Sequence, residues 1–208
     1  MKKILMYSII VLYFVNASAQ VSADRFGTFT DTRDGKVYRT IKMGEQIWFA
    51  ENLAYRPNSG KYYAPKDDTS LIAKAGCLYE FKTTKTVVPH GWHLPTKKDW
   101  EILIKNSGNN ETDVYDSLIA TKVFYVLLAG LHDATDGFMW ANKATIFWSA
   151  SPVNGDALST WVFQFYRDDS SRLAKMMHGN NSSGNAYYIR CLKNDDEYEK
   201  TQKTKVKK

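Results

Sequence analysis

Residues 91–103 read GWHLPTKKDWEIL and are the most informative segment of the sequence. Gly91 and Pro95 enclose a short aromatic segment and are typical of a turn. Thr96 is a good helix N-cap, and Asp99 three residues later supplies an acid that can complete a capping box. The stretch therefore predicts a turn that leads directly into a helix.

Two helices are expected in this part of the chain. The first carries Trp100, Leu103 and Ile104 on one face and ends in the polar run 106–110, NSGNN. The second is weaker and is expected over about residues 112–122.

The rest of the chain alternates short apolar segments with polar turns. Asp34-Gly35 is a strong hairpin-turn signal, and the alternating segments 37–42 and 46–49 that follow it predict an antiparallel meander. Residues 55–70 are rich in Tyr, Pro, Asn, Ser and Asp and are expected to form a surface loop. Further strands are predicted at residues 77–81, 124–129, 146–150, 161–166, 172–178 and 186–192.

The N-terminus has the three-part plan of a secretory signal peptide. Residues 1–3 carry two lysines, residues 4–15 form an apolar run, and Ala17 and Ala19 place small residues where a signal peptidase reads. The run is shorter than the about 20 residues of a transmembrane helix, which favours cleavage over a retained membrane anchor. We therefore expect an exported protein, periplasmic, on the cell surface or extracellular, with no membrane span after cleavage.

Length and charge bound the class of protein. Removal of residues 1–19 leaves 208 − 19 = 189 residues, which suits one domain, with two small ones as the alternative. The formal charge of +6 falls to +4 when Lys2 and Lys3 are lost. Residues 193–208 hold six lysines and four acids and supply two of these charges. No basic face remains that would indicate nucleic acid as a partner.

The chain has two cysteines, Cys77 and Cys191. In an oxidising compartment the simplest state of an isolated pair is one disulfide, here closing a loop of more than a hundred residues. The alternative is two buried thiols that behave as small apolar side chains. A metal site is disfavoured because no Cys-x-x-Cys or Cys/His spacing occurs.

Four phrases follow one another along the chain: DGKVYRTIKMGEQIWFAENL, GWHLPTKKDWEIL, FWSAS and YYIRCLK. In this order they resemble the Fibrobacter succinogenes major paralogous domain family. The resemblance covers roughly residues 29–193, so we expect a signal peptide at 1–19, a lead at 20–28, the domain at 29–193 and a disordered charged tail at 194–208. The matching residues are Asp34, Gly35, Lys36, Trp48, Glu51, Asn52, Leu53, 91–95, Trp100, Phe147, Trp148, Ser149, Arg190 and Cys191.

The resemblance implies a C-type-lectin-like α+β fold, with twisted antiparallel sheets, two helices in the first half and long loops in the second. It also implies a relationship to the formylglycine-generating sulfatase-modifying enzymes. Those enzymes use two nearby cysteines late in the chain, whereas only Cys191 is present there, so we expect their activity to be missing. Many family members carry a cysteine where this chain has Val88. Either Cys77 takes over as the partner of Cys191, or the bridge is absent.

Other patterns for catalysis and metal binding are weak, and we predict no catalytic residue, metal or cofactor. His90 and His93 lie in a Gly/Pro turn, whereas a zinc site needs three or four converging ligands. The Gly-x-Ser-x-Gly elbow of a serine hydrolase is absent. A glycosidase needs two facing carboxylates. Glu51 and Asp133 cannot be paired from the sequence, and Glu51 also fits a hydrogen bonder at a hairpin end.

Binding is the stronger functional hypothesis. Trp140 lies among acids and amides in residues 133–142, where a rigid ring beside hydrogen-bonding oxygens would make a platform for a sugar or peptide. The alternative is a loop that packs its own tryptophan. The candidate ligand-binding residues are Asp133, Asp136, Trp140, Asn142, Asn154 and Asp156. The calcium signatures of lectins are absent, so calcium-dependent sugar binding is not expected.

These observations together predict an exported, non-catalytic recognition or surface-interaction module. Its expected partner is a glycan or a cell-surface protein. The alternatives are a cryptic enzyme of the sulfatase-modifying kind and a purely structural protein of the bacterial envelope.

Overall fold

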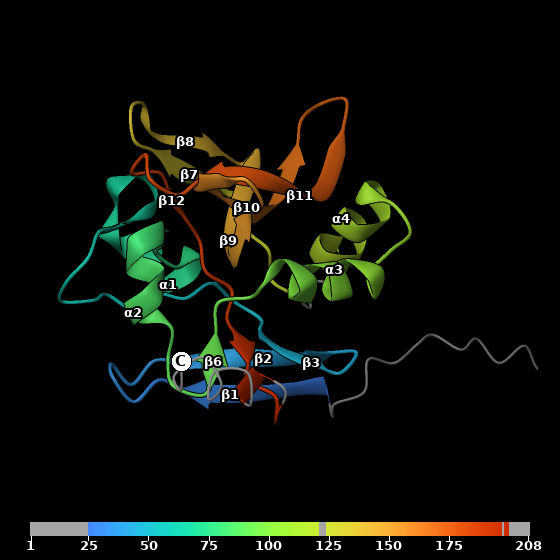
Figure 1. The fold of residues 1–208 in the computed structure, drawn as a ribbon, viewed down its shortest axis with the longest axis horizontal. Coiled ribbons are helices and arrows are strands. Elements are labelled where there is room, and N and C mark those ends of the chain that lie inside the picture. The colour runs from blue at the N-terminus through green and yellow to red at the C-terminus, as the bar shows by residue number, and fades with distance from the viewer. Residues whose placement is uncertain (1–24, 121–123, 197, 200–208) are drawn as a thin grey trace, which may run out of the picture.

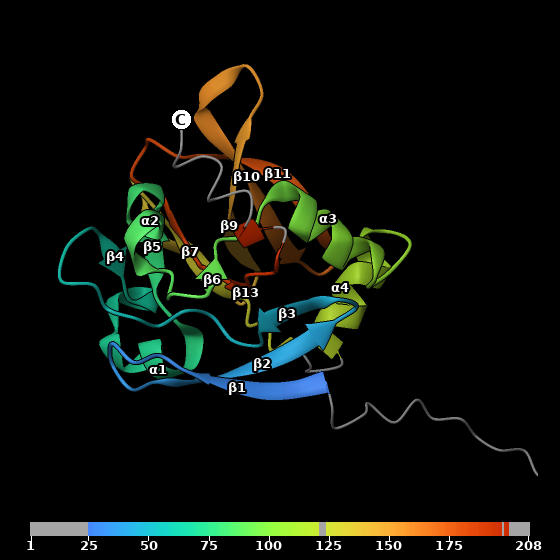
Figure 2. The same cartoon turned by 60° about the horizontal axis from the view of Figure 1, so that its bottom comes forward.

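Two β-sheets with helices on two flanks make up the structure, which is a computed structural model (Figures 1 and 2). It describes residues 25–120, 124–196 and 198–199, except for the side chain of Ala120. The predicted signal peptide and most of the predicted tail lie outside the described residues. The mixture of helices with mostly antiparallel strands confirms the α+β class.

The first sheet is antiparallel throughout and has the order β1–β2–β3–β13–β6. The predicted Asp34-Gly35 turn joins its first two strands, with Gly35 at φ +75°. Strand β13, which comes last in sequence, lies between β3 and β6. The first sheet therefore combines the first strands of the described chain with its last strand. The strands are β1 (Phe26–Thr30), β2 (Val37–Met43), β3 (Gln46–Phe49), β13 (Leu192–Lys193) and β6 (Trp92–His93).

The second sheet has the order β11–β10–β9–β7–β12–β5–β4, with β8 paired to β7. Strands β7 and β9 run parallel, and the other pairs are antiparallel. The strands are β11 (Arg172–Asn180), β10 (Asp156–Arg167), β9 (Ala144–Val153), β7 (Ala129–Asp133), β12 (Ala186–Tyr187), β5 (Leu78–Glu80), β4 (Tyr62–Tyr63) and β8 (Gly137–Ala141).

Helices α3 and α4 lie on one flank, and α1 and α2 lie on the opposite flank in both views (Figures 1 and 2). The capping box predicted for α3 is present: the Thr96 hydroxyl accepts a hydrogen bond from the Asp99 backbone N–H, and Asp99 accepts one from the Thr96 N–H at 2.8 Å. The helices are α1 (Ile72–Ala75), α2 (Thr84–Val87), α3 (Lys97–Lys105) and α4 (Glu111–Ala120), with 3₁₀ turns η2 (Pro65–Asp67), η3 (Thr69–Leu71) and η4 (Phe81–Thr83).

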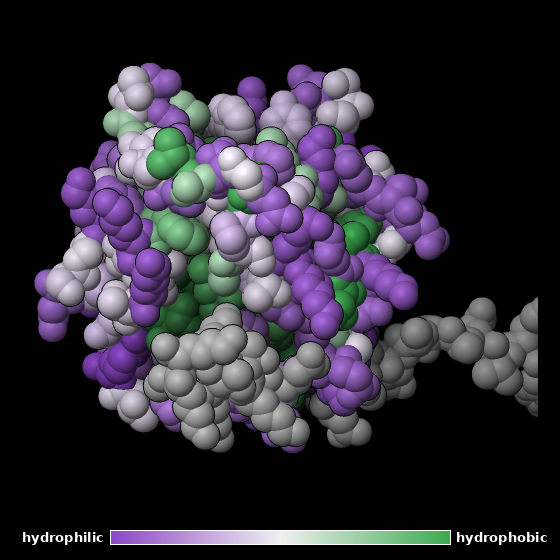
Figure 3. Space-filling view, viewed as in Figure 1, coloured by the Kyte–Doolittle hydropathy of each residue, from purple (hydrophilic) through white to green (hydrophobic). Residues whose placement is uncertain are grey.

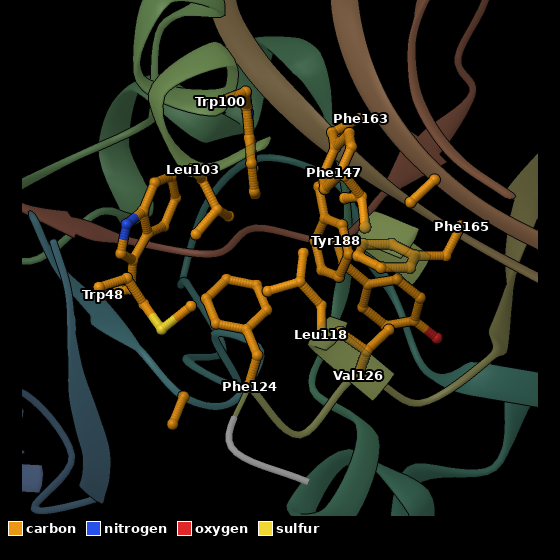
Figure 4. Close-up of a cluster of buried hydrophobic side chains, with 14 of the residues drawn as sticks. Trp48, Trp100, Leu103, Leu118, Phe124, Val126, Phe147, Phe163, Phe165 and Tyr188 are labelled. Carbon is orange, nitrogen blue, oxygen red and sulfur yellow. The ribbon is translucent and has the colours of Figure 1, made fainter. Parts of the chain in front are cut away.

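A cluster of aromatic side chains fills the space between the two sheets and the α3–α4 flank (Figure 4). Trp100 on α3 lies 4.7 Å from the Trp48 ring of the first sheet and 4.9 Å from the Phe163 ring of the second. All three side chains are fully buried. Truncating one such ring costs about 3–5 kcal/mol of folding stability. The packing of α3 against both sheets therefore stabilises their arrangement.

A second cluster lies around α1 and α2 and includes Trp92, Trp148 and both cysteines. The face shown in Figure 3 is mostly hydrophilic, and apolar side chains show mainly in hollows between polar ones. No helix among the described residues is both long and apolar enough to cross a membrane.

The structure corrects four predictions. The first half has four helices where two were expected, because the short helices α1 and α2 lack a periodic apolar pattern long enough to predict them. The segment predicted as one strand at residues 186–192 is two short strands, β12 and β13, since it passes from one sheet to the other. Residues 124–128 are not a strand, since β7 begins only at Ala129. Residues 133–142 are not a long loop, because most of them build the hairpin β7–β8. Asp136-Gly137 in its turn is itself a hairpin signal, which the polar composition of the segment obscured.

Candidate functional site

Two of the six predicted ligand-binding residues, Asp133 and Asp136, lie at the turn of the β7–β8 hairpin. The Asp133 carboxylate accepts hydrogen bonds from the backbone N–H groups of Thr135 at 2.8 Å and Asp136 at 3.2 Å. This is the ordinary turn-stabilising use of an aspartate. Asp133 therefore has a structural role in the turn.

Asn154 and Asp156 flank the tight turn between β9 and β10. Asp156 accepts a hydrogen bond from the Leu158 N–H at 2.9 Å, and its pKa is lowered by the side chain of Ser159 and by this bond. The ten residues of β9 separate this turn from Asn142, a span of about 30 Å. The six predicted residues therefore do not converge on one site.

Trp140 and Asn142 remain together at the end of β8. Both have left-handed backbones, with φ of +59° and +64°. The Trp140 side chain is 46% exposed, and its ring packs edge-on against Tyr166 at a centroid distance of 6.4 Å. The result is an aromatic pair, Trp140–Tyr166, in which Trp140 on β8 is exposed and Tyr166 on β10 is half-buried.

A cleft of about 410 Å³ is lined by residues close in sequence to this pair. Asn142 and Arg167, which line it, follow closely on Trp140 and Tyr166 in sequence. Its walls come from η2, α1, α4, residues 126–129, β8 and the end of β10, and most of the lining side chains are apolar. Of the six predicted residues, Asn142 lines this cleft.

Polar groups in the cleft are few and mostly cationic. Lys66, Lys74 and Arg167 line it, and its lining contains no Asp or Glu. Tyr115 also lines it, but its hydroxyl is buried rather than open to the cleft, and it interacts with Arg167. Burial raises the Tyr115 pKa, and the positive charge of Arg167 acts in the opposite direction.

Sequence reasoning missed this cleft because its walls come from six separate parts of the chain. The predicted strand at residues 124–129 is instead an irregular segment, so Leu127 and Leu128 lie half-buried in the cleft wall. The apolar run at residues 124–129 was the available sequence signal, but it does not show which elements pack around it.

A second hollow, of about 600 Å³, lies over the start of α3. Here His93 is 6% exposed and uses both ring nitrogens: Nδ1 lies 2.9 Å from Asn194 Oδ1, and Nε2 lies 3.5 Å from Asp99 Oδ2. The Tyr198 ring stacks on it at 3.9 Å. His93 is therefore a partnered core histidine that links Asn194 and Tyr198 to Asp99 of α3.

Asp99 is the charged member of this group. Burial raises its pKa, but hydrogen bonds from His93 and Thr96 outweigh burial, so the net pKa is lowered. Each of these polar groups interacts with another one, which favours a structural role over a catalytic one.

Cys77 and Cys191 are free thiols, in place of the disulfide that the sequence favoured. Both are fully buried in the second cluster, and the Cys77 thiol lies 3.7 Å from the Ala54 carbonyl. Burial raises the pKa of Cys77 to about 11 and raises that of Cys191 further. Both sulfurs thus behave as the small apolar side chains of the alternative interpretation.

The acids considered for catalysis have other partners. Glu51 accepts hydrogen bonds from the Arg39 backbone N–H and guanidinium, each at 3.0 Å, as expected for a residue that ties a hairpin end. Across the described ranges, no group of three or more His, Cys, Asp or Glu could hold a metal ion.

Comparison with known proteins gives one finding. The family model described as the Fibrobacter succinogenes major domain matches residues 41–193, from within β2 to the end of β13. Comparisons with curated proteins and with solved structures gave no match. The lectin-like arrangement and the relationship to sulfatase-modifying enzymes therefore stay predictions.

Proposed function

The chain belongs to the Fibrobacter succinogenes major domain family, and we propose that it is an exported, non-catalytic recognition module that binds a glycan or a cell-surface protein. Export is proposed from the signal-peptide pattern of residues 1–19.

The exposed Trp140 ring, packed against Tyr166, is the observation that carries the proposal. A bulky residue with positive φ is uncommon, and such strain is concentrated at binding and catalytic sites. Trp140 lies on β8, which is hydrogen-bonded to β7. Its backbone is therefore held in place, and little conformational entropy is lost when a partner stacks on its ring.

The enzyme alternative has less support. Sulfatase-modifying chemistry needs reactive sulfur, and a thiol reacts as its thiolate. Cys191 is fully buried with a raised pKa, which opposes thiolate formation. The candidate acids Glu51 and Asp133 are held by hydrogen bonds within their own hairpins.

Glycan and peptide arrays probed with the mature protein test the proposal. We expect a specific signal that falls about tenfold or more in Trp140→Ala, as for a buried aromatic anchor of an interface. Phe26→Ala is the matched control, because Phe26 is 48% exposed on β1 of the other sheet. An array without signal would favour the structural alternative, and equal loss in both variants would contradict a site at Trp140.

A further inference from the structure

We propose that the 410 Å³ cleft is a second binding site, which takes a small amphiphilic carboxylate: one acid group on an aliphatic or aromatic body. This inference goes beyond recognition of a glycan or protein at Trp140, and it depends on different residues.

The size and walls of the cleft fit such a body. Its volume falls within the range of about 300–1,000 Å³ that is typical of small-molecule sites. Ile119, Leu127, Leu128 and Phe138 form much of the wall and are only half-buried. An apolar ligand body would remove these side chains from water, which favours binding.

The charges at the cleft select an acid. Lys66, Lys74 and Arg167 make no ion pair in the described chain, and no acidic side chain lines the cleft beside them. Asp168, which follows Arg167, instead accepts hydrogen bonds from Ser170 and Ser171 and from the Tyr166 hydroxyl.

Arg167 supplies a second reason. Its guanidinium interacts with the buried Tyr115 side chain, where it acts against the rise in pKa that burial causes. The planar fork of a guanidinium suits a carboxylate head group.

The backbone at the cleft is unusual as well. Lys66 and Asn142 both line it and both have positive φ, at +55° and +64°. Such conformations in non-glycine residues are concentrated where binding sites are preorganised. Two of them in the lining of one cleft agree with a preorganised site.

Titration of the mature protein with octanoate, and with octanol as its uncharged counterpart, tests this inference by calorimetry. We expect octanoate to bind with a Kd on the order of 0.1–1 mM and octanol about fivefold more weakly or worse. The double variant Lys66→Gln/Lys74→Gln should weaken octanoate binding about fivefold and leave octanol unchanged. Arg167→Gln, which removes the guanidinium fork, should also weaken octanoate selectively.

The matched control is Lys82→Gln/Lys85→Gln, which removes two exposed lysines from η4 and α2, away from the cleft. Absence of octanoate binding by folded protein, equal binding of octanol, or an equal effect of the control pair would each overturn the assignment. An array signal lost in Trp140→Ala together with no octanoate binding would leave the proposed function standing and remove only this site.

Discussion

At the scale of single residues, Arg190 is the most constrained side chain in the structure. It is fully buried and donates hydrogen bonds to the Phe124 carbonyl at 2.5 Å and to Asn52 Oδ1 at 2.7 Å. Its guanidinium lies 4.5 Å from the Phe124 ring centroid and 5.2 Å from that of Phe147. Desolvation lowers its pKa to about 9, so it stays charged at neutral pH. This arginine joins the ends of segments far apart in the chain.

Replacement of Arg190 by Met is expected to lower the free energy of unfolding by about 3–5 kcal/mol. The variant leaves the Phe124 carbonyl and the Asn52 side chain buried without their donor. Urea unfolding at neutral pH measures the loss. Arg172→Met is the control, since Arg172 forms an exposed ion pair with Asp116, and such pairs add little stability. A similar effect of both substitutions would contradict this role of Arg190.

At the scale of elements, the start of α3 combines two features in one place. Asp99 completes the capping box with Thr96 and also faces His93 of β6 at 3.5 Å. The cap that the sequence predicts therefore also links the helix to the first sheet. The hydrogen bond from His93 also lowers the Asp99 pKa, so the charge of Asp99 supports both the helix cap and the link to the first sheet.

The stability contributed by Asp99 is expected to depend on pH in a defined direction. A carboxyl group whose pKa falls on folding adds stability that is complete above its unfolded-state pKa and is lost as pH falls through its folded-state pKa. Asp99→Asn should therefore cost about 1 kcal/mol at pH 7, and its difference from the unmodified protein should shrink below about pH 4.

Urea unfolding of both proteins from pH 7 downward measures this difference, and carboxyls common to both cancel. Glu101→Gln is the control, because it removes a half-exposed carboxylate from the same helix without altering the cap. A gap that stays constant or widens on acidification would be inconsistent with the role assigned to Asp99.

The β7–β8 hairpin shows how an element can escape a sequence-based prediction. Gly130 in β7 has φ of +79°, and a Cβ there would lie 2.4 Å from the Met139 carbonyl oxygen of β8. The close approach requires glycine, but the sequence does not show what approaches it. The polar residues around Trp140 predicted a loop, whereas backbone pairing between β7 and β8 makes this segment a hairpin.

At the scale of the whole molecule, residues 186–193 connect the two sheets. Their first part, β12, pairs with β5 and β7, and their last part, β13, pairs with β3 and β6. Cys191 lies on this crossing segment and is fully buried, as is Cys77 next to β5. Access to either thiol therefore requires a large opening of the fold.

Both thiols are expected to react with a thiol reagent only after unfolding. Burial keeps them protonated and shielded, so native protein should react far more slowly than protein in urea. Absorbance with a disulfide reagent at pH 8, without reductant, counts the free sulfurs. Two per unfolded chain is the expected result, whereas none, with two appearing only after reduction, would show a disulfide in the purified protein.

Features that depend on neighbouring residues could be predicted from the amino-acid sequence alone. The Asp34-Gly35 turn, the Thr96–Asp99 capping box and the inward face of Trp100 and Leu103 all follow from spacings of a few residues. The hydrogen bonds and side-chain directions involved are local, so the pattern suffices to predict them. The ordered family phrases likewise predicted the membership found over residues 41–193.

Which distant groups come into contact depends on how the whole chain folds. The tertiary structure separated Asn154 and Asp156 from Asn142 by the length of β9, left the cysteines unpaired, and assembled the cleft with Lys66, Tyr115 and Arg167 on different elements. Burial and strand pairing across the chain fix these relations, because removing apolar surface from water does not depend on distance in sequence. Residues far apart become neighbours only when the whole core forms.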